Sequence, residues 1–300
     1  MFPNVEIITD KSTLFSNPQK QTVSGLDRRS RAFLKIQDGC NSFCSYCIVP
    51  YVRNVLWSKP ENEVISEITN LVRNGYSEVV LTGIHVGKYE SGLSSLVSKI
   101  IQTSLNFRIR ISSIEINEID DNLIKIMKEN PDKICRHLHI PLQSGSQEIL
   151  KQMNRKYSKK TFEEKINKII KELPDLALTT DIITGFPGET YKHHKETCEF
   201  VKKLPFVGFH IFRYSDRQGT KAYQLKSKVP QVDIKNRSKD LFEIDLIKRK
   251  TFLDNNLGIN RKAVKIGKSK ALTDNYILVE TDTSKISGVF ETKITKNSKI

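Results

Sequence analysis

The sequence predicts an α/β fold of six parallel strands that alternate with helices, followed by a small all-β module. Between residues 32 and 215, short runs of Val, Ile, Leu and Phe alternate six times with amphipathic segments. This alternation is typical of a parallel sheet with helices outside it. After residue 256, short β-type runs separated by turn residues replace it. Six such units form either an open doubly wound sheet or an incomplete barrel, and both place function at the carboxyl ends of the strands.

Each element follows from the local pattern of apolar residues. We expect strands at residues 32–36, 78–83, 108–116, 136–142, 176–186 and 208–215. Apolar residues recur at helical spacing between Pro60 and Gly75, which predicts the first helix. The proline lies near the start of this helix and the glycine ends it. We expect further helices at 93–102, 121–130, 146–154, 161–173, 190–204 and 231–256. Polar and glycine residues follow the strands, as a cofactor site needs, although such residues also simply end strands.

Composition divides the chain into three parts. Residues 1–30 are polar and without periodicity, so we expect a linker remnant there. Residues 31–230 form the predicted α/β core, and residues 231–300 form a helical connection and a β module. Residues 261–300 contain nine Lys and Arg but only four Asp and Glu. This module fits an RNA-binding appendage, with a plain solvated hairpin as the alternative.

The charge and hydropathy of the whole chain restrict its partners and its location. The formal net charge is +15 and the pI is about 9.5, which favours a polyanionic partner such as nucleic acid. The alternative is a Lys-rich composition that spreads lysines over any solvated face. No apolar run approaches the roughly 20 residues that cross a bilayer, and no secretory signal is present. We expect a cytoplasmic protein with no membrane partner.

Three of the five cysteines, Cys40, Cys44 and Cys47, lie within the segment DGCNSFCSYCIVP. In a reducing compartment such a group binds metal or does redox chemistry. Structural zinc needs four ligands, and the next candidate in the sequence is His85. The spacing fits an iron–sulfur cluster better. Three thiolates on a four-iron cube leave one iron open to a small ligand with nitrogen and oxygen donors.

This segment resembles the radical S-adenosylmethionine enzymes, whose Cys-x3-Cys-x-aromatic-Cys loop follows the first strand of a partial (βα)6 barrel. Tyr46 supplies the aromatic residue. LKIQDGCNSFCSYCIVPYVR, VVLTGIH, RIRISSIE, HLHIPLQSGSQEILKQMNRKY, TTDIITGFPGET and FRYSDRQGTKAY are similar to motifs of the tRNA methylthiotransferases. They are most similar to the MtaB branch, which acts on threonylcarbamoyladenosine beside the anticodon, and less so to the MiaB and RimO branches. The basic tail resembles a shortened TRAM domain.

The resemblance implies one 4Fe-4S cluster on the three cysteines, with S-adenosylmethionine on the open iron. Cleavage of that cofactor gives a 5′-deoxyadenosyl radical, which serves to methylthiolate C2 of the modified adenosine. The implied partners are tRNA and an electron donor protein. The residues expected to bind S-adenosylmethionine are Tyr46, Gly83, Ser113, Glu115, Gln143, Arg155 and Asp181. No residue is assigned a catalytic role.

These assignments have specific chemical reasons. Tyr46 is expected near the adenine, with simple packing as the alternative, and Gly83 lets backbone approach the methionine amine. Glu115 can accept hydrogen bonds from ribose hydroxyls or the ammonium group. Arg155 can pair bidentately with the methionine carboxylate, and the alternative is a helix-surface arginine.

The sequence departs from the family in one major respect. The family normally begins with a further domain that holds an auxiliary cluster implicated in sulfur supply, and no cysteine precedes Cys40. We expect the chain to lack that domain, so a separate chain would have to carry it. The alternative functions are a decayed or repurposed RNA-binding fragment with a structural cluster, and a zinc-stabilised binding module. Trp57 and Ile116 also replace residues usual in the family.

The remaining cysteines and histidines have simpler interpretations. Cys135 and Cys198 are expected to be small core residues. His193 and His194 lie in a charged helical segment and are expected to be solvated. His137 and His139 alternate on one strand face, where either a pocket or the core can hold them.

Overall fold

The computed structural model describes residues 30–284 and 286–300, so the predicted linker lies outside the described residues except for Ser30. Six parallel strands form the core, and these are β1 (Arg31–Asp38), β3 (Glu78–Gly83), β4 (Arg108–Ile111), β5 (His137–His139), β6 (Ala177–Thr184) and β7 (Phe206–Arg213). The first three and the last three form two parallel sheets. Isolated parallel bridges at Ile109–Ile134 and Ser113–His139 join these sheets into one curled half-barrel. The predicted fold class is confirmed.

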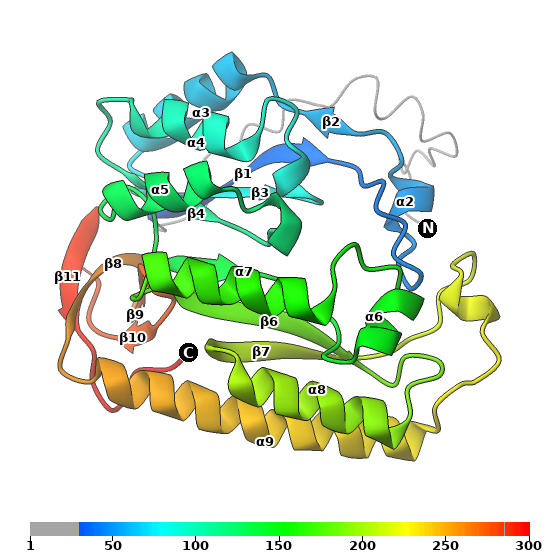
Figure 1. Cartoon of the computed structure of the whole chain (residues 1–300). Helices are drawn as coiled ribbons and strands as arrows, with labels where there is room; N and C mark the ends of the chain where they lie inside the picture. The colour runs from blue at the N-terminus through cyan, green and yellow to red at the C-terminus, as the bar shows by residue number, and fades with distance from the viewer. Residues whose placement is uncertain (1–29, 285) are drawn as a thin grey trace, which may run out of the picture.

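Helices cover the outer face of the half-barrel (Figure 1). They are α2 (Val49–Val52), α3 (Glu61–Arg73), α4 (Leu93–Ile101), α5 (Asp121–Glu129), α6 (Gln147–Gln152), α7 (Lys159–Glu172), α8 (Tyr191–Lys203) and α9 (Gln231–Asn256). The side chains of Asp120, Ser158 and Thr190 cap α5, α7 and α8 by accepting a backbone N–H of the first turn, which stabilises helix ends. A two-residue strand, β2 (Trp57–Ser58), pairs antiparallel with β1. No described helix is both long and apolar enough to cross a membrane.

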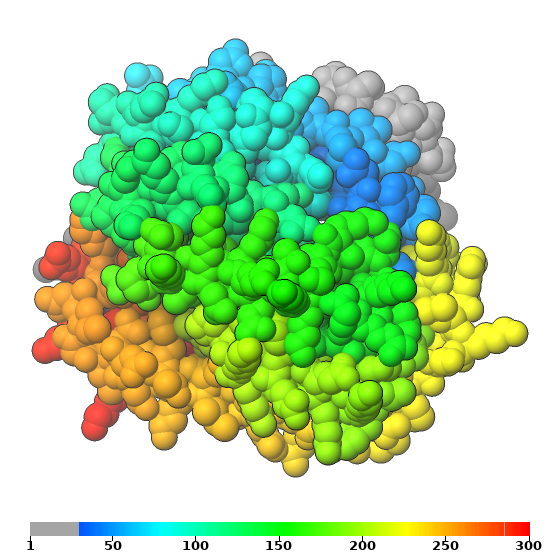
Figure 2. Space-filling view, in the orientation of Figure 1, coloured from blue at the N-terminus to red at the C-terminus, as the bar shows by residue number. Residues whose placement is uncertain are grey.

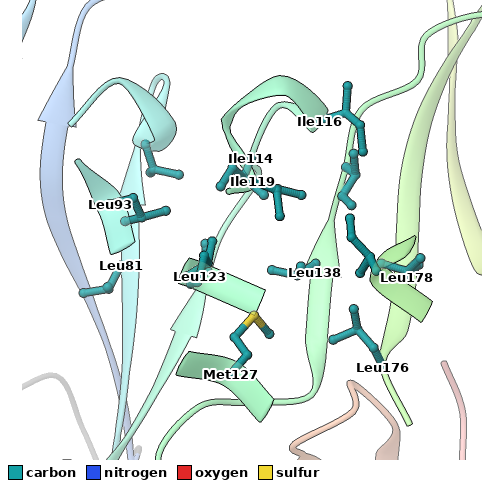
Figure 3. Close-up of a cluster of buried hydrophobic side chains, with 14 of the residues drawn as sticks. Leu81, Leu93, Ile114, Ile116, Ile119, Leu123, Met127, Leu138, Leu176 and Leu178 are labelled. Atoms are coloured by element: carbon teal, nitrogen blue, oxygen red, sulfur yellow. The ribbon is translucent and has the colours of Figure 1, made fainter. Parts of the chain in front are cut away.

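The main core lies between the sheet and these helices. Figure 3 shows Leu81, Leu138 and Leu178 of the strands facing Leu123 and Met127 of α5, and all five are buried. Burying a side chain of this size stabilises the fold by about 1.5–3 kcal/mol. Because one face of each strand is occupied in this way, the alternate residues of the strands must face the interior of the half-barrel.

Two expectations from the sequence are corrected. The strand predicted for residues 108–116 ends at Ile111, because the chain then crosses to β5, where the Ile114 N–H donates to the carbonyl of His139. His193 and His194 are buried rather than solvated. The imidazole of His193 contacts Glu148 at 3.1 Å, and that of His194 contacts Asp240 at 2.9 Å.

The basic C-terminal part forms an antiparallel sheet in the order β10-β9-β8-β11. Its strands are β8 (Asn260–Gly267), β9 (Lys270–Thr273), β10 (Leu278–Glu280) and β11 (Val289–Lys293). Figure 2 shows this orange and red module at the end of the molecule opposite the blue segment that follows β1. The module therefore closes the amino end of the half-barrel. The domain division at residue 230 stays a prediction, and Leu241 and Ile244 of α9 pack into the main core.

A buried carboxylate joins the module to the barrel. Glu78, at the start of β3, is fully buried and pairs with Arg108 at 2.7 Å, with Arg110 at 2.9 Å and with Arg31 at 3.0 Å. Arg108 also donates to the carbonyls of Lys262 and Leu272, at 2.8 and 3.1 Å. Arg110 donates in the same way to the carbonyls of Thr273 and Asp274, at 2.8 and 3.1 Å. One carboxylate thus orients two arginines that bind the backbone of the module.

The pKa of Glu78 predicts how stability depends on pH. Burial alone would raise this pKa, but Arg110 and Arg108 outweigh burial and lower it from 4.5 to about 2. The stabilisation is therefore complete above about pH 4.5 and is lost as the pH falls toward 2. The difference corresponds to roughly 3 kcal/mol.

We expect Glu78→Gln to lower the free energy of unfolding at pH 7 by about 3–5 kcal/mol, because it leaves buried arginines without a counter-charge. The variant should also lose much of the decline in stability between pH 4.5 and 2. Urea unfolding at several pH values measures both effects. Glu280→Gln, which removes an exposed ion pair with Lys299, is the control. Equal stability of the two variants would contradict this role of Glu78.

Candidate cofactor site

The three clustered cysteines lie in the loop that follows β1, at the carboxyl end of the half-barrel. Gly39 begins this loop with φ of +80°, and a Cβ there would lie 2.0 Å from the carbonyl oxygen of Val55. Only glycine fits this position. The backbone N–H of Cys40 donates to the carbonyl of Arg53 at 3.1 Å, and Arg53 also pairs with Asp38 at 3.1 Å. The start of the loop is therefore fixed against the segment after α2.

The three thiols are half-buried, and Cys40 and Cys44 lie close enough to Cys47 to affect its pKa. Their sulfur atoms do not all lie within 4.8 Å of one another, whereas a tetrahedral zinc ion with Zn–S bonds of about 2.3 Å holds its sulfurs about 3.8 Å apart. Thiolates on separate corners of an iron–sulfur cube lie farther apart, because each binds a different iron. Three soft thiolates on one loop therefore fit an iron–sulfur cluster better than a single ion.

His85, which follows β3, contacts the first cysteine. Its Nδ1 lies 3.5 Å from the Cys40 sulfur, and its Nε2 lies 2.6 Å from the carboxylate of Glu118. Burial would lower the pKa of His85, but hydrogen bonds to Cys40 and Glu118 raise it to about 9. Burial would likewise raise the pKa of Cys40, yet the contacts with His85 and Ser42 lower it. Burial raises the pKa of Cys47, because it outweighs the hydrogen bond from the backbone of Val49.

The other side of the loop is attached to the end of α6. The Ser45 N–H donates to the carbonyl of Met153 at 3.0 Å, and the Asn154 amide donates to the carbonyl of Phe43 at 2.7 Å. Phe43, Asn154 and Gln143 all have positive φ values, of 49°, 59° and 68°. Non-glycine residues in this conformation cluster at functional sites, where surrounding contacts hold them. Apart from its place in the motif MNRKY, nothing in the sequence indicated a role for Asn154.

Arg155 lies at the centre of the site. Its guanidinium pairs with Glu115, and it contacts the Cys44 sulfur at 3.4 Å and the Tyr46 hydroxyl at 3.3 Å. It also donates to the Tyr157 hydroxyl at 3.0 Å and to the carbonyl of Pro141 at 3.3 Å. The side chain is 4% exposed, so it is not a helix-surface arginine. The structure thus brings together three predicted cofactor residues, Tyr46, Glu115 and Arg155, beside a cluster cysteine.

The other predicted cofactor residues have different surroundings. A Cβ at Gly83 would lie 2.7 Å from the carbonyl oxygen of Gln37, so close packing on β1 already requires glycine. Ser113 bridges to β5, and the Gln143 N–H donates to the carbonyl of Asp181 at 2.7 Å. The Asp181 carboxylate contacts His139 and His210, at 3.0 and 3.2 Å. The cofactor roles of these four residues stay predictions.

Tyr46 and the segment GFPGE also have packing roles. The Tyr46 ring packs against a small buried cluster that contains Met153 and Phe186. The Gly185 N–H donates to the Glu189 carboxylate at 2.8 Å, and Glu189 pairs with Arg237 of α9 at 2.7 Å. These contacts fix the loop after β6 beside the cysteine loop, where backbone and ring are available to a bound cofactor.

Comparison with known proteins identifies the class. The profile of the Radical SAM superfamily matches residues 34–201, more than half of the chain. The chain therefore belongs to the Radical SAM superfamily. This membership supports a 4Fe-4S cluster and S-adenosylmethionine as its cofactors, and the donor set described above fits them.

Curated relatives narrow the resemblance to the tRNA methylthiotransferases. The chain is 45% identical over 214 residues to the threonylcarbamoyladenosine tRNA methylthiotransferase MtaB of Bacillus subtilis, an alignment that covers 69% of this chain and 47% of that protein. It is 39% identical over 282 residues to the tRNA-2-methylthio-N(6)-dimethylallyladenosine synthase of Clostridium tetani, covering 89% and 61%. The resemblance drawn from the motifs is confirmed. The chain spans about half to three fifths of the length of these relatives.

Solved structures share the fold at low sequence identity. Coproporphyrinogen III oxidase (HemN) from Escherichia coli superposes with a TM-score of 0.54 and 13% identity, covering 92% of this chain and 74% of that protein. The radical S-adenosylmethionine methyltransferase TsrM from Kitasatospora setae, solved with cobalamin and a [4Fe-4S] cluster, gives 0.55 and 14%, covering 64% and 38%. At such low identity these likenesses show the fold alone.

We expect anaerobic reconstitution to load about four irons per chain, and we expect Cys40→Ala, Cys44→Ala and Cys47→Ala each to abolish this uptake. Each variant removes one of three ligands, and the chain offers no neighbouring thiol as a substitute. Iron and sulfide analysis with visible absorption measures the outcome. Cys198→Ala, on α8, is the control and should load normally. Stable zinc in the purified protein with no iron uptake would contradict the cluster.

Proposed function

We propose that the chain is a radical S-adenosylmethionine enzyme of tRNA modification that methylthiolates C2 of N6-threonylcarbamoyladenosine. The observation that carries this proposal is the meeting of the cysteine loop with the Glu115–Arg155 pair at the carboxyl end of the half-barrel. A soft three-thiolate donor set beside a buried guanidinium that pairs with a half-buried carboxylate suits a cluster whose open iron takes an amino acid ligand. The similarity to MtaB of Bacillus subtilis supports the substrate class.

In this proposal Cys40, Cys44 and Cys47 hold one 4Fe-4S cluster. When bound, the cluster and S-adenosylmethionine supply the electron and the 5′-deoxyadenosyl radical, and the protein binds, orients and excludes water. Glu115 accepts hydrogen bonds from the ammonium group or the ribose hydroxyls. Tyr46, in the cysteine loop and packed against Met153 and Phe186, limits the space beside the adenine.

Arg155 has a double role in this proposal. Its five N–H donors already have partners: Glu115 and Pro141 on one nitrogen, Cys44 and Tyr46 on another, and Tyr157 on the third. The contacts to Cys44, Tyr46 and Pro141 are the long ones, at 3.4, 3.3 and 3.3 Å. Binding of a methionine carboxylate would exchange one of these, while the ion pair keeps Glu115 oriented. Arg155 thus positions Glu115 and Cys44 as well as binding the cofactor.

An RNA partner is supported by charge and by exposed aromatic rings. The net charge of +15 favours binding of a polyanion. Beside the cysteine loop, Phe43 and Tyr51 are 43% and 46% exposed and meet edge to face at 5.7 Å between ring centroids. Exposed aromatic rings bind unpaired bases by stacking. An adenosine beside the anticodon is such a base, so these rings lie where a substrate loop would reach the cofactor.

Transfer of a methylthio group also requires a sulfur source and an electron donor. The cysteines other than the cluster ligands are Cys135, which is buried beside Glu78, and Cys198 on α8. Neither belongs to a second triplet. We therefore place the sulfur-supplying cluster on a separate chain or domain, and we expect a small redox protein to deliver the electron.

The first test is reductive cleavage of S-adenosylmethionine by the reconstituted chain. We expect 5′-deoxyadenosine, measured by liquid chromatography with mass spectrometry, and none from Cys40→Ala. Methylthiolated nucleoside should form only when threonylcarbamoyladenosine tRNA and a sulfur-donating partner are added. Salt-sensitive RNA binding without any 5′-deoxyadenosine would instead favour an RNA-binding fragment with a structural cluster.

The second test concerns Arg155. Arg155→Lys keeps the charge but cannot reproduce the forked contacts to Glu115 and Cys44, so we expect S-adenosylmethionine to bind about 10–100-fold more weakly. Equilibrium binding to the cluster-loaded protein measures this loss. Arg73→Lys, at the end of the outer helix α3, is the control. Unchanged affinity with normal iron content would limit Arg155 to packing.

A further inference from the structure

The interior of the half-barrel holds a second group of metal-type donors, which the cysteine site does not use. The group consists of His139 on β5, Asp181 on β6 and His210 on β7. In the part of the chain that the structure describes, it is the one trio of His, Cys, Asp or Glu whose donor atoms all lie within 4.8 Å of one another. Two imidazoles and a carboxylate form a donor set that transition-metal ions prefer.

The register of the sheet builds this group. His139 pairs with Thr179, and Asp181 pairs with His210, so each pair points to the same face of the sheet. Thr179 and Asp181 lie two residues apart on β6 and therefore share that face. Ile182, the neighbour of Asp181, packs into the main core on the opposite face. The three donors thus face the interior of the half-barrel, away from the helices.

The distances match those around a metal ion. The Asp181 Oδ1 atom lies 3.0 Å from His139 Nε2 and 3.2 Å from His210 Nδ1. Around an ion with bonds of about 2.0–2.1 Å, adjacent ligand atoms lie about 2.9–3.4 Å apart. The two imidazole rings stack with centroids 5.0 Å apart. An ion could therefore enter with small rotations of side chains and without a change of the strands.

A supporting shell orients the most buried ligand. The Nδ1 atom of His139 lies 2.9 Å from the Thr179 hydroxyl, which also lies 3.0 Å from His137 Nε2. A histidine ligand that bonds a second group through its other nitrogen is the usual arrangement at metal sites. Thr179 therefore directs His139 Nε2 toward Asp181.

We propose that His139, Asp181 and His210 bind a divalent transition-metal ion inside the half-barrel. Three protein ligands leave at least one coordination position open, as at sites that bind a water or a substrate atom. The side chains of His139 and Asp181 are 12% and 20% exposed, and that of His210 is 55% exposed. Two of the ligands are therefore largely buried, and the site opens to solvent at His210. The open position faces the interior. It suits an oxygen donor of a bound molecule.

The test uses the cluster-loaded chain, so that iron occupies the cysteine thiols. Zn²⁺ is added, loosely bound metal is removed by gel filtration with a weak chelator, and zinc is counted by mass spectrometry. We expect one zinc per chain beyond the cluster. Asp181→Asn and His139→Gln should lose it, and Thr179→Val, which removes only the supporting hydroxyl, should weaken binding about 10–100-fold.

Asp240→Asn is the matched control. It removes the carboxylate of another His–Asp pair, 2.9 Å from His194 on the outside of the barrel, where no third donor atom among the described residues lies within 4.8 Å of both partners. This variant should retain its zinc. Zinc X-ray absorption should show nitrogen and oxygen neighbours without sulfur. Sulfur neighbours, equal zinc retention by Asp181→Asn and the parent chain, or no zinc beyond the cluster would overturn the proposal.

Discussion

The buried carboxylate of Glu78 determines how the two parts of the molecule fit together. It lies where β1, β3 and β4 begin, and it orients Arg108 and Arg110 toward the backbone carbonyls of the C-terminal module. Three arginines around one carboxylate leave an excess of positive charge, and those carbonyls supply the missing acceptors. Because a charge can be buried only with such partners, the barrel end and the module depend on each other for stability.

This closure gives the half-barrel an interior with one closed end. The ring of Tyr276, from the module, stacks on His137 with centroids 4.2 Å apart, so the module reaches the first interior residue of β5. From there the interior passes the His139–Asp181 pair and ends at the cysteine loop and Arg155. A ligand that reaches the cofactor residues must therefore enter from the carboxyl end or from the open side of the curled sheet.

Much of this was predictable from sequence, and the limits have physical causes. The alternation of apolar strands and helices located all six parallel strands, because that periodicity reflects burial of one face. The spacing of Cys40, Cys44 and Cys47 predicted a cluster rather than zinc, because three neighbouring thiolates lack the fourth ligand that structural zinc needs. The burial of His193 and His194 was missed, because their partners Glu148 and Asp240 lie more than 40 residues away in sequence. For the same reason, nothing local distinguished Glu78 from a surface carboxylate.

Two donor sets of different chemistry then lie in one barrel. The cysteine loop offers soft thiolates, whereas His139, Asp181 and His210 offer nitrogen and oxygen donors that lie within 4.8 Å of one another. Soft thiolates select iron–sulfur clusters, and imidazole with carboxylate suits single Zn²⁺ or Fe²⁺ ions. The two sites therefore differ in the type of ligand that they offer. Because neither shares a ligand with the other, loss of one should leave the other intact.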